Sequence, residues 1–270
     1  MTSTAVDYTA IKAKQRTGWE TGDYPRVGNT LQIIAELLVE AADIRAGQRA
    51  LDVACGQGNA AIAAARRFAE ATGVDYAANL LAQGRERAIA EHLPVTFTEG
   101  DAEELPAPDA SYDVVLSTVG VMFAPDHQRA ADELVRVTKP GGKIALACWT
   151  PAGMIGQMFK VVAKWAPPPA GVKPPTLWGT EEHLAELFGD RVEWTAQKRD
   201  YVFRYRSPEH FSDWFRQFYG PITKLAGTLP EEDLVQFAAE LADVPRSFNR
   251  ADDGTVAATA EYLEAVGIKR

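Results

Sequence analysis

The stretch Leu51-Asp52-Val53-Ala54-Cys55-Gly56-Gln57-Gly58-Asn59 organises the rest of this chain. Its first half is apolar enough for a buried strand, and its two glycines allow a sharp turn with room for a ligand beside it. Asn59 is a good helix cap, and the small residues 60–65 follow it. We therefore expect a strand, a glycine turn and a helix whose free N–H groups point at a ligand.

The glycine turn alone fits two kinds of nucleotide ligand. Gly56, Gly58 and Ala61 satisfy the spacing of the dinucleotide fingerprint, which would make the chain an NAD(P)-binding oxidoreductase. Asp52 argues against that alternative, because an anion beside the turn opposes a pyrophosphate and suits an ammonium or sulfonium group. The sequence also lacks a convincing Tyr-x-x-x-Lys or comparable hydride-transfer pair.

Five pieces of sequence, the glycine turn among them, follow one another in the order of a known enzyme family. They are Leu51–Gly58, Val74-Asp75, Gly100-Asp101-Ala102, Tyr112–Ser117 and the segment from Arg136 to Gly142. Together they resemble the class I S-adenosylmethionine (SAM)-dependent methyltransferases, in the branch of the ubiquinone- and menaquinone-type C-methyltransferases (methyltransferase type 11). The resemblance implies SAM as the cofactor. Gln57 stands where Thr or Ser is common in the family and Asn59 where a third glycine is frequent, but both keep the backbone donors.

The expected cofactor site lies at the ends of successive strands. Asp75 follows Gly58 at close to the spacing at which an acid meets ribose hydroxyls, although an Asp at a strand end also commonly caps the next helix. We expect Tyr76 to lie against the adenine face and Asp101 to accept from the adenine amine. The predicted cofactor-binding residues are Asp52, Ala54, Gly56, Gln57, Gly58, Asn59, Asp75, Tyr76, Asp101, Ala102, Ser117 and Thr118.

Strand-like and helix-like segments alternate through the middle of the chain, which is typical of a parallel sheet. We expect an α/β fold: a Rossmann-like, doubly wound, seven-stranded, mostly parallel sheet whose last strand is antiparallel. A single methyltransferase domain would span 1–270. Its parts would be N-terminal helices or a lid in 1–45, a SAM-binding core in 46–150, and substrate-covering helices with the final two strands in 151–270. Aromatic residues in the polar segment 1–28, among them Trp19 and Tyr24, need something to cover. The resemblance implies a lid over the cofactor, and the alternative is ordinary packing on the outside of the core.

Residues 191–205 alternate like a strand, but the phase of their apolar positions changes partway along. A slip of one residue moves every side chain to the opposite face of a sheet. The sequence therefore predicts a bulge or break between Gln197 and Asp200. The two phases are Val192, Trp194 and Ala196, then Tyr201, Phe203 and Tyr205.

Composition excludes several classes of function. A formal net charge of −9 over 270 residues opposes binding to phosphate backbones, so we expect no nucleic-acid partner. No apolar run approaches a membrane span and no signal peptide is evident, so we expect no membrane insertion and a cytoplasmic location. Cys55 and Cys148 lie in expected core strands, and we expect both to be reduced thiols. The histidines and cysteines show no metal-ligand spacing, and the chain is expected to be a monomer or homodimer.

The sequence says less about catalysis than about the cofactor. Transfer of an activated methyl group mainly requires alignment and exclusion of water, so we assign no catalytic residue. The polar candidates for a base are His127, His183, His210, Asp126 and Tyr24, of which His127 is placed best.

The acceptor is expected to be a small or medium apolar molecule with an oxygen or carbon nucleophile. This expectation rests on aromatic residues outside the nucleotide core, which can line a pocket. They can equally form a separate helical core or a dimer contact, and a non-catalytic SAM-binding protein is a further alternative. The residues are Trp149, Phe159, Trp165, Trp178, Trp214, Phe215, Phe218 and Tyr219.

Overall fold

A computed structural model describes residues 6–270, so the first five residues of the expected 1–45 segment lie outside it. The strands are β1 (Arg49–Val53), β2 (Glu70–Asp75), β3 (Val95–Glu99), β4 (Tyr112–Thr118), β5 (Thr138–Trp149), β6 (Val192–Tyr205) and β7 (Val256–Lys269). The helices are α1 (Tyr8–Trp19), α2 (Tyr24–Gly28), α3 (Gln32–Ala41), α4 (Asn59–Ala65), α5 (Ala78–Ala90), α6 (His127–Val137), α7 (Met154–Trp165), α8 (Glu181–Phe188), α9 (Pro208–Phe218), α10 (Gly220–Ala226) and α11 (Glu231–Arg246). Short 3-10 turns are η1 (Asn29–Leu31), η2 (Val121–Phe123), η3 (Pro175–Gly179) and η4 (Gly189–Arg191).

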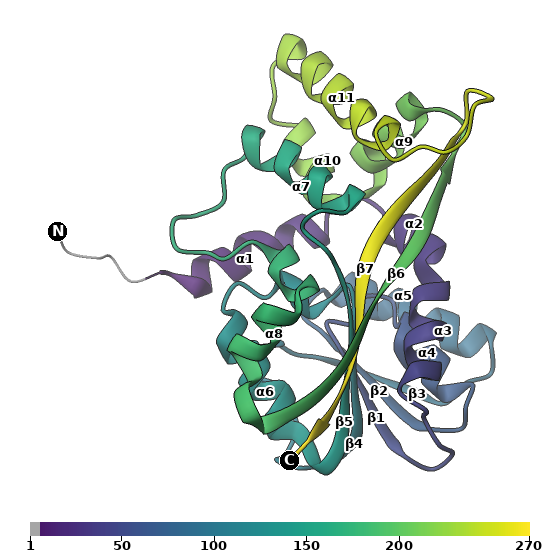
Figure 1. Ribbon diagram of the computed structural model, residues 1–270, viewed down its shortest axis with the longest axis vertical. Coiled ribbons are helices and arrows are strands. Elements are labelled where there is room, and N and C mark those ends of the chain that lie inside the picture. Colours follow the sequence, from purple (N-terminus) through teal and green to yellow (C-terminus); the bar gives the residue numbers. More distant parts are fainter. Residues whose placement is uncertain (1–5) are drawn as a thin grey trace, which may run out of the picture.

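Within residues 6–270 the strands form one seven-stranded sheet in the order β3-β2-β1-β4-β5-β7-β6. Strands β1 to β5 pair in parallel, whereas β7 runs antiparallel to both β5 and β6. The predicted fold class is confirmed. Helices α3, α4 and α5 cover one face of the sheet, and α6 and α8 cover the other (Figure 1). None of the helices in the described part of the chain is both long and apolar enough to cross a membrane.

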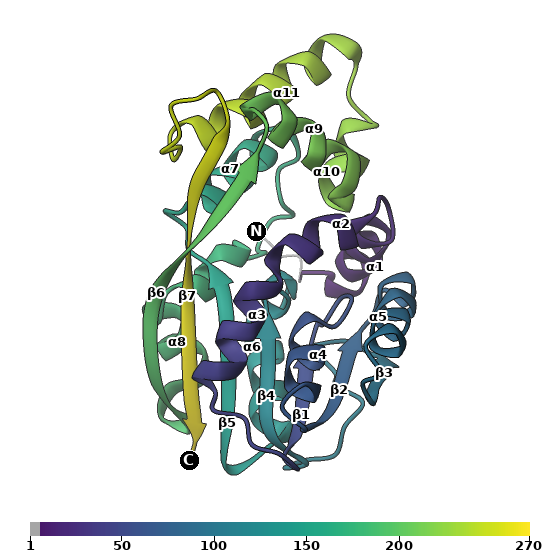
Figure 2. The same ribbon diagram turned by 90° about the vertical axis from the view of Figure 1, so that its right-hand side faces the viewer.

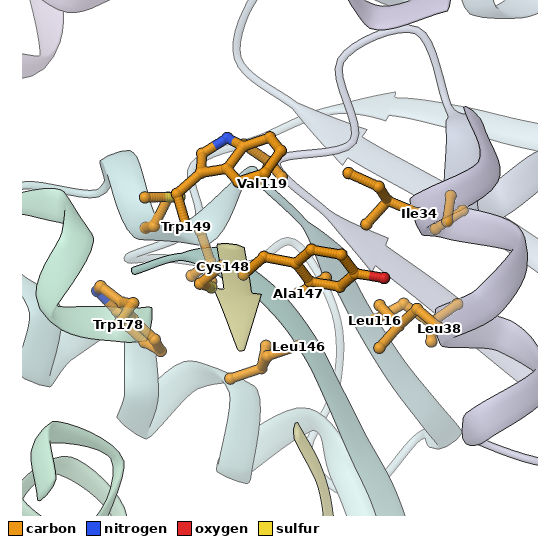
Figure 3. Close-up of a cluster of buried hydrophobic side chains, with 14 of the residues drawn as sticks. Ile34, Leu38, Leu116, Val119, Leu146, Ala147, Cys148, Trp149 and Trp178 are labelled. Atoms are coloured by element: carbon orange, nitrogen blue, oxygen red, sulfur yellow. The ribbon is translucent and has the colours of Figure 1, made fainter. Parts of the chain in front are cut away.

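The main core fills both sides of the central strands because these strands are apolar on both faces. Figure 3 shows Ile34 and Leu38 of α3 on one side of β5 and Trp178 on the other. All three side chains are almost fully excluded from solvent. The parallel strands therefore form a rigid platform whose loops carry the site.

The predicted bulge in β6 is wrong. Residues Val192 to Tyr205 pair with β7 in one unbroken register. The apolar phase changes because the covered face changes along the strand: Trp194 packs against Phe188 at the end of α8, whereas Phe203 packs against Phe211 and Phe215 of α9.

The outer halves of β6 and β7 rise as a twisted two-stranded ribbon above the parallel strands (Figure 2). Helices α7, α9, α10 and α11 gather around this ribbon, above the carboxyl ends of the parallel strands (Figure 2). The chain after β5 thus supplies two outer strands and a helical cover over the end of the sheet where the site lies.

Candidate active site

A cavity with an empty volume of about 810 Å³ opens at the carboxyl ends of β1, β2, β3 and β4. Open parallel sheets bind ligands at this edge. Of the predicted residues, Gly58 and Ser117 do not line the cavity. The others do, namely Asp52, Ala54, Gly56, Gln57, Asn59, Asp75, Tyr76, Asp101, Ala102 and Thr118.

Asp75 ends β2 and fixes the glycine turn. One carboxylate oxygen accepts the Gly56 N–H at 2.8 Å, and the other accepts the Ala77 N–H at 2.8 Å. Burial raises the pKa of this carboxyl, and the amide donors oppose that effect. An ionised carboxylate offers about four lone-pair directions. Asp75 therefore keeps acceptor capacity for hydroxyl donors in the cavity.

Asp52 caps α4 from inside β1. Its carboxylate accepts the Ala61 N–H at 2.9 Å, and burial raises its pKa to about 7.

The prediction that Asn59 caps α4 is wrong, because Asn59 is the first helical residue of α4. The Asn59 side chain instead donates to the Gly28 carbonyl at 2.9 Å and accepts from Arg87 at 2.7 Å. Asn59 thus joins α4 to α2 and α5.

Gly58 has a structural role in the turn between β1 and α4. Its φ of +80° is a conformation that side chains rarely adopt. A Cβ atom there would lie 2.5 Å from the ring of Phe97 in β3. A side chain at this position would therefore collide with Phe97, so the glycine does not act by leaving room in the cavity.

The N-terminal helix α1 is fastened across the cavity. Lys12 of α1 pairs with Asp101 and, at 2.8 Å, with Glu103, whose side chain is 1% exposed. Gln15 donates to the Phe123 carbonyl at 3.2 Å. The carboxylate of Asp101, which was expected to accept from an adenine amine, thus already forms an ion pair with Lys12 of α1.

Strand β4 ends in a strained turn. Ser117 is fully buried, donates to the Val53 carbonyl at 2.7 Å and accepts the Val121 N–H at 2.8 Å, so it joins the end of β1 to η2. Thr118 lines the cavity, and its buried hydroxyl has no partner within residues 6–270. Val119 has φ +53°, which is an outlier for a β-branched residue. Such strain is concentrated at functional sites.

A second, apolar cavity adjoins the first and has an empty volume of about 320 Å³; we call it the acceptor pocket. It shares Tyr24, Val119 and Phe123 with the cofactor cavity. Its remaining lining residues come from six elements. They are Val27, Leu31, Trp149, Ile155, Met158, Phe159, Phe203, Phe215 and Tyr219.

Half of the aromatic residues expected around an acceptor are in this pocket, namely Trp149, Phe159, Phe215 and Tyr219. The other half lie elsewhere. Trp178 is fully buried on the opposite side of β5 from α3, where it packs against Phe188 (Figure 3). Trp165 packs against Phe237, and Trp214 packs against Phe218. Sequence alone did not separate these two groups, because no local pattern shows which side of the sheet or which helix each aromatic residue will face.

Of the candidate bases, Tyr24 lies at the junction of the two cavities. Burial raises its pKa to about 12, so its hydroxyl stays protonated at neutral pH. His127 and His183 instead form a buried pair, with 2.9 Å between Nδ1 of the first and Nε2 of the second. Asp126 caps α6, and His210 accepts the Arg206 N–H through Nδ1.

Several cavity residues were not predicted as cofactor-binding residues. Lys12 carries no local signal, because its partner Asp101 is 89 positions away. Trp19 did carry a local sequence signal, because it is an aromatic residue in a polar stretch. The remaining unpredicted residues are Cys55, Ala60, Leu80, Gly100, Val119, Gly120, Phe123, Ala124 and Pro125.

The chain is similar to known proteins over the fold and the cavity just described. A family model described as a methyltransferase domain matches residues 51–146. Uncharacterized protein Rv1403c of Mycobacterium tuberculosis is 38% identical over 239 residues, which is 86% of this chain and 87% of that protein. The demethylmenaquinone methyltransferase of Shouchella clausii is 39% identical over 106 residues, or 38% of this chain and 45% of that protein.

Among solved structures, the YcgJ protein of Bacillus subtilis superposes with a TM-score of 0.63. The superposition covers 87% of this chain and 97% of YcgJ at 22% sequence identity, a level that supports the shared fold.

These matches define the class of protein. The chain belongs to the same family as the mycobacterial protein and has the methyltransferase domain. It is a class I SAM-dependent methyltransferase, as the resemblance of its motifs predicted. The oxidoreductase alternative is therefore set aside.

Proposed function

We propose that this methyltransferase modifies an oxygen or carbon nucleophile on a small or medium, mostly apolar molecule held in the acceptor pocket. The observation that carries the proposal is the shared wall of the two cavities, formed by Tyr24, Val119 and Phe123. A reacting atom held against this wall would lie beside the cofactor and away from bulk water. Proximity and exclusion of water are the main contributions that a methyltransferase must make.

The cofactor cavity suits SAM better than a dinucleotide. Three of its lining residues are carboxylic acids, Asp52, Asp75 and Asp101. The one lysine among the lining residues, Lys12, is paired with Asp101 and Glu103. When bound, SAM supplies a methyl group activated by a positive sulfur, and an acidic cavity favours that charge. The buried Thr118 hydroxyl has no partner within residues 6–270 and is free to bind the ligand.

Within this proposal the predicted residues keep distinct roles. Asp75 would accept from ribose hydroxyls, and Tyr76 and Ala102 would lie along the adenine. Tyr24 would hold the acceptor by a hydrogen bond from its protonated hydroxyl. The segments 1–45, 46–150 and 151–270 would then serve as lid, cofactor core and acceptor cover of one domain.

A screen with isotope-labelled SAM tests the proposal against phenols, quinols, polyketide-like enols and fatty acids. We expect turnover on at least one of these classes. Phe159→Glu, which places a charge in the acceptor pocket, is expected to reduce that turnover at least tenfold. Binding of S-adenosylhomocysteine, measured by calorimetry, should stay unchanged in this variant. Turnover confined to peptides or nucleic acids would refute the proposal.

A further inference from the structure

A third cavity lies between α3 and the outer half of β6, and we call it the outer groove. Its empty volume of about 1260 Å³ exceeds that of either cavity described above. The outer groove and the cofactor cavity share no lining residue. Its residues are Thr30, Ile33, Ile34, Leu37, Asp200, Tyr201, Val202, Phe203, Arg204, Tyr205, His210, Trp214 and Tyr262.

The rim of the outer groove is apolar and exposed along α3, whereas β6 adds the exposed charged residues Asp200 and Arg204. Ile33 is 56% exposed and Leu37 is 37% exposed, on consecutive turns of α3. Val202 and Tyr201 of β6 belong to the same lining. Contiguous apolar surface of this kind commonly marks a binding site.

Three polar atoms among the groove residues are buried and have no hydrogen-bond partner within residues 6–270. They are the hydroxyl oxygens of Tyr205 and Tyr262 and the indole nitrogen of Trp214. Tyr262 is only 1% exposed as a residue. An unpaired buried polar group is costly, and each of these three can donate a hydrogen bond. A bound molecule with a carbonyl, ether or hydroxyl oxygen would satisfy them.

A thin wall separates the outer groove from the acceptor pocket. Phe203 lines both cavities, so the wall is one aromatic ring thick at that point. Beside it, the Tyr201 hydroxyl donates to the Thr30 carbonyl at 2.6 Å and joins β6 to η1. The ring of Tyr201 lies edge-on to that of Phe203, with 4.7 Å between centroids. This wall consists of side chains and one hydrogen bond.

We propose that the outer groove binds the tail of the acceptor. The inference rests on the proposed function, because the head of the same molecule would occupy the acceptor pocket. The acceptor is then an elongated amphiphile, with a nucleophilic phenol or enol at one end and an oxygen-bearing hydrocarbon chain at the other. Phe203 and the Tyr201–Thr30 hydrogen bond form the gate through which the chain passes.

Binding of 4-alkylphenols to the protein saturated with S-adenosylhomocysteine tests this, with the tail lengthened from ethyl to decyl. Each buried methylene is expected to tighten binding about fourfold. Ile33→Glu places a charge on the groove rim and should weaken binding of 4-decylphenol at least tenfold without changing that of 4-ethylphenol. Ile89→Glu is the matched control, because Ile89 is an exposed isoleucine on α5, 73% exposed and outside the groove. Tyr201→Phe, which removes the gate hydrogen bond, should tighten 4-decylphenol alone.

The outcomes separate this inference from the proposed function. If longer tails tightened binding to Ile33→Glu as much as to the wild type, the outer groove would not be the tail site. The acceptor pocket would still stand as the site of the head group. Failure of 4-ethylphenol to bind any variant would count against both. Sedimentation supplies a third outcome: a wild-type dimer that Ile33→Glu dissociates would overturn the inference and assign the groove to contact between two copies of this chain.

Discussion

The buried histidine pair predicts how stability responds to acid. His127 of α6 and His183 of α8 are each 4% exposed, and Trp178 packs against both rings. Nδ1 of His183 lies 2.7 Å from the Glu186 carboxylate, so that nitrogen carries the proton and donates. While both rings are neutral, Nε2 of the same ring accepts from Nδ1 of His127 at 2.9 Å. This hydrogen bond is lost only when both facing nitrogens carry a proton.

The expected size of the effect follows from the pKa of His127. Burial, with a smaller contribution from His183, lowers this pKa from 6.5 to about 4. The difference, 6.5 minus 4, is about 2.5 units, and at 1.36 kcal/mol per unit it corresponds to about 3 kcal/mol. Because the pKa in the folded state lies below that of the unfolded state, this stability is fully present above about pH 6.5. It is lost as the pH falls toward about 4.

Urea unfolding of the wild type and of His127→Gln, from about pH 4 to pH 7.5, measures this directly. The free energy of unfolding of the wild type should fall between about pH 6.5 and pH 4, and the variant should lack about 3 kcal/mol of that fall. His92→Asn is the control, because it removes an exposed histidine at a left-handed turn that asparagine tolerates. If His127→Gln kept the wild-type slope over this range, the reasoning would be refuted.

Two further predictions concern the cofactor core. Asp75→Ala should weaken S-adenosylhomocysteine by about 1–3 kcal/mol in calorimetry, because the ligand hydroxyls and the Gly56 N–H lose their charged acceptor; an unchanged affinity would place the ribose elsewhere. Gly58→Val should lower the free energy of unfolding by about 2–5 kcal/mol, from left-handed strain and collision with Phe97. Gly141→Val is its control, since Gly141 has φ +73° and no atom within 4 Å, so equal losses in the two variants would contradict the collision.

The sequence predicted what depends on local pattern. Alternating apolar segments indicated the order of strands and helices. The glycine turn and the acids after β2 and β3 also lie at the cavity, because the carboxyl ends of parallel strands meet at one edge.

The errors arise where contacts join distant parts of the chain. Asp52 rather than Asn59 caps α4, because a carboxylate in the preceding strand reaches the first amides of the helix. The apolar phase of β6 reflects which helix covers each half of the strand, and α9 and α8 lie on opposite faces. Trp178 belongs to the core for the same reason. No local pattern shows which side of a sheet a later segment will cover.

The position of β7 has a consequence for synthesis of the chain. It is the last strand in the sequence, yet it lies between β5 and β6 and pairs with both. Residues up to Trp149 can begin to assemble on the ribosome, but pairing of β6 starts only after Val256 has been translated and is complete only with Lys269. Pairings of such high sequence separation are slow to form. During translation, β6 therefore lacks its partner strand, and its aromatic side chains are uncovered. An unpaired strand of this kind favours self-association of the chain at that stage.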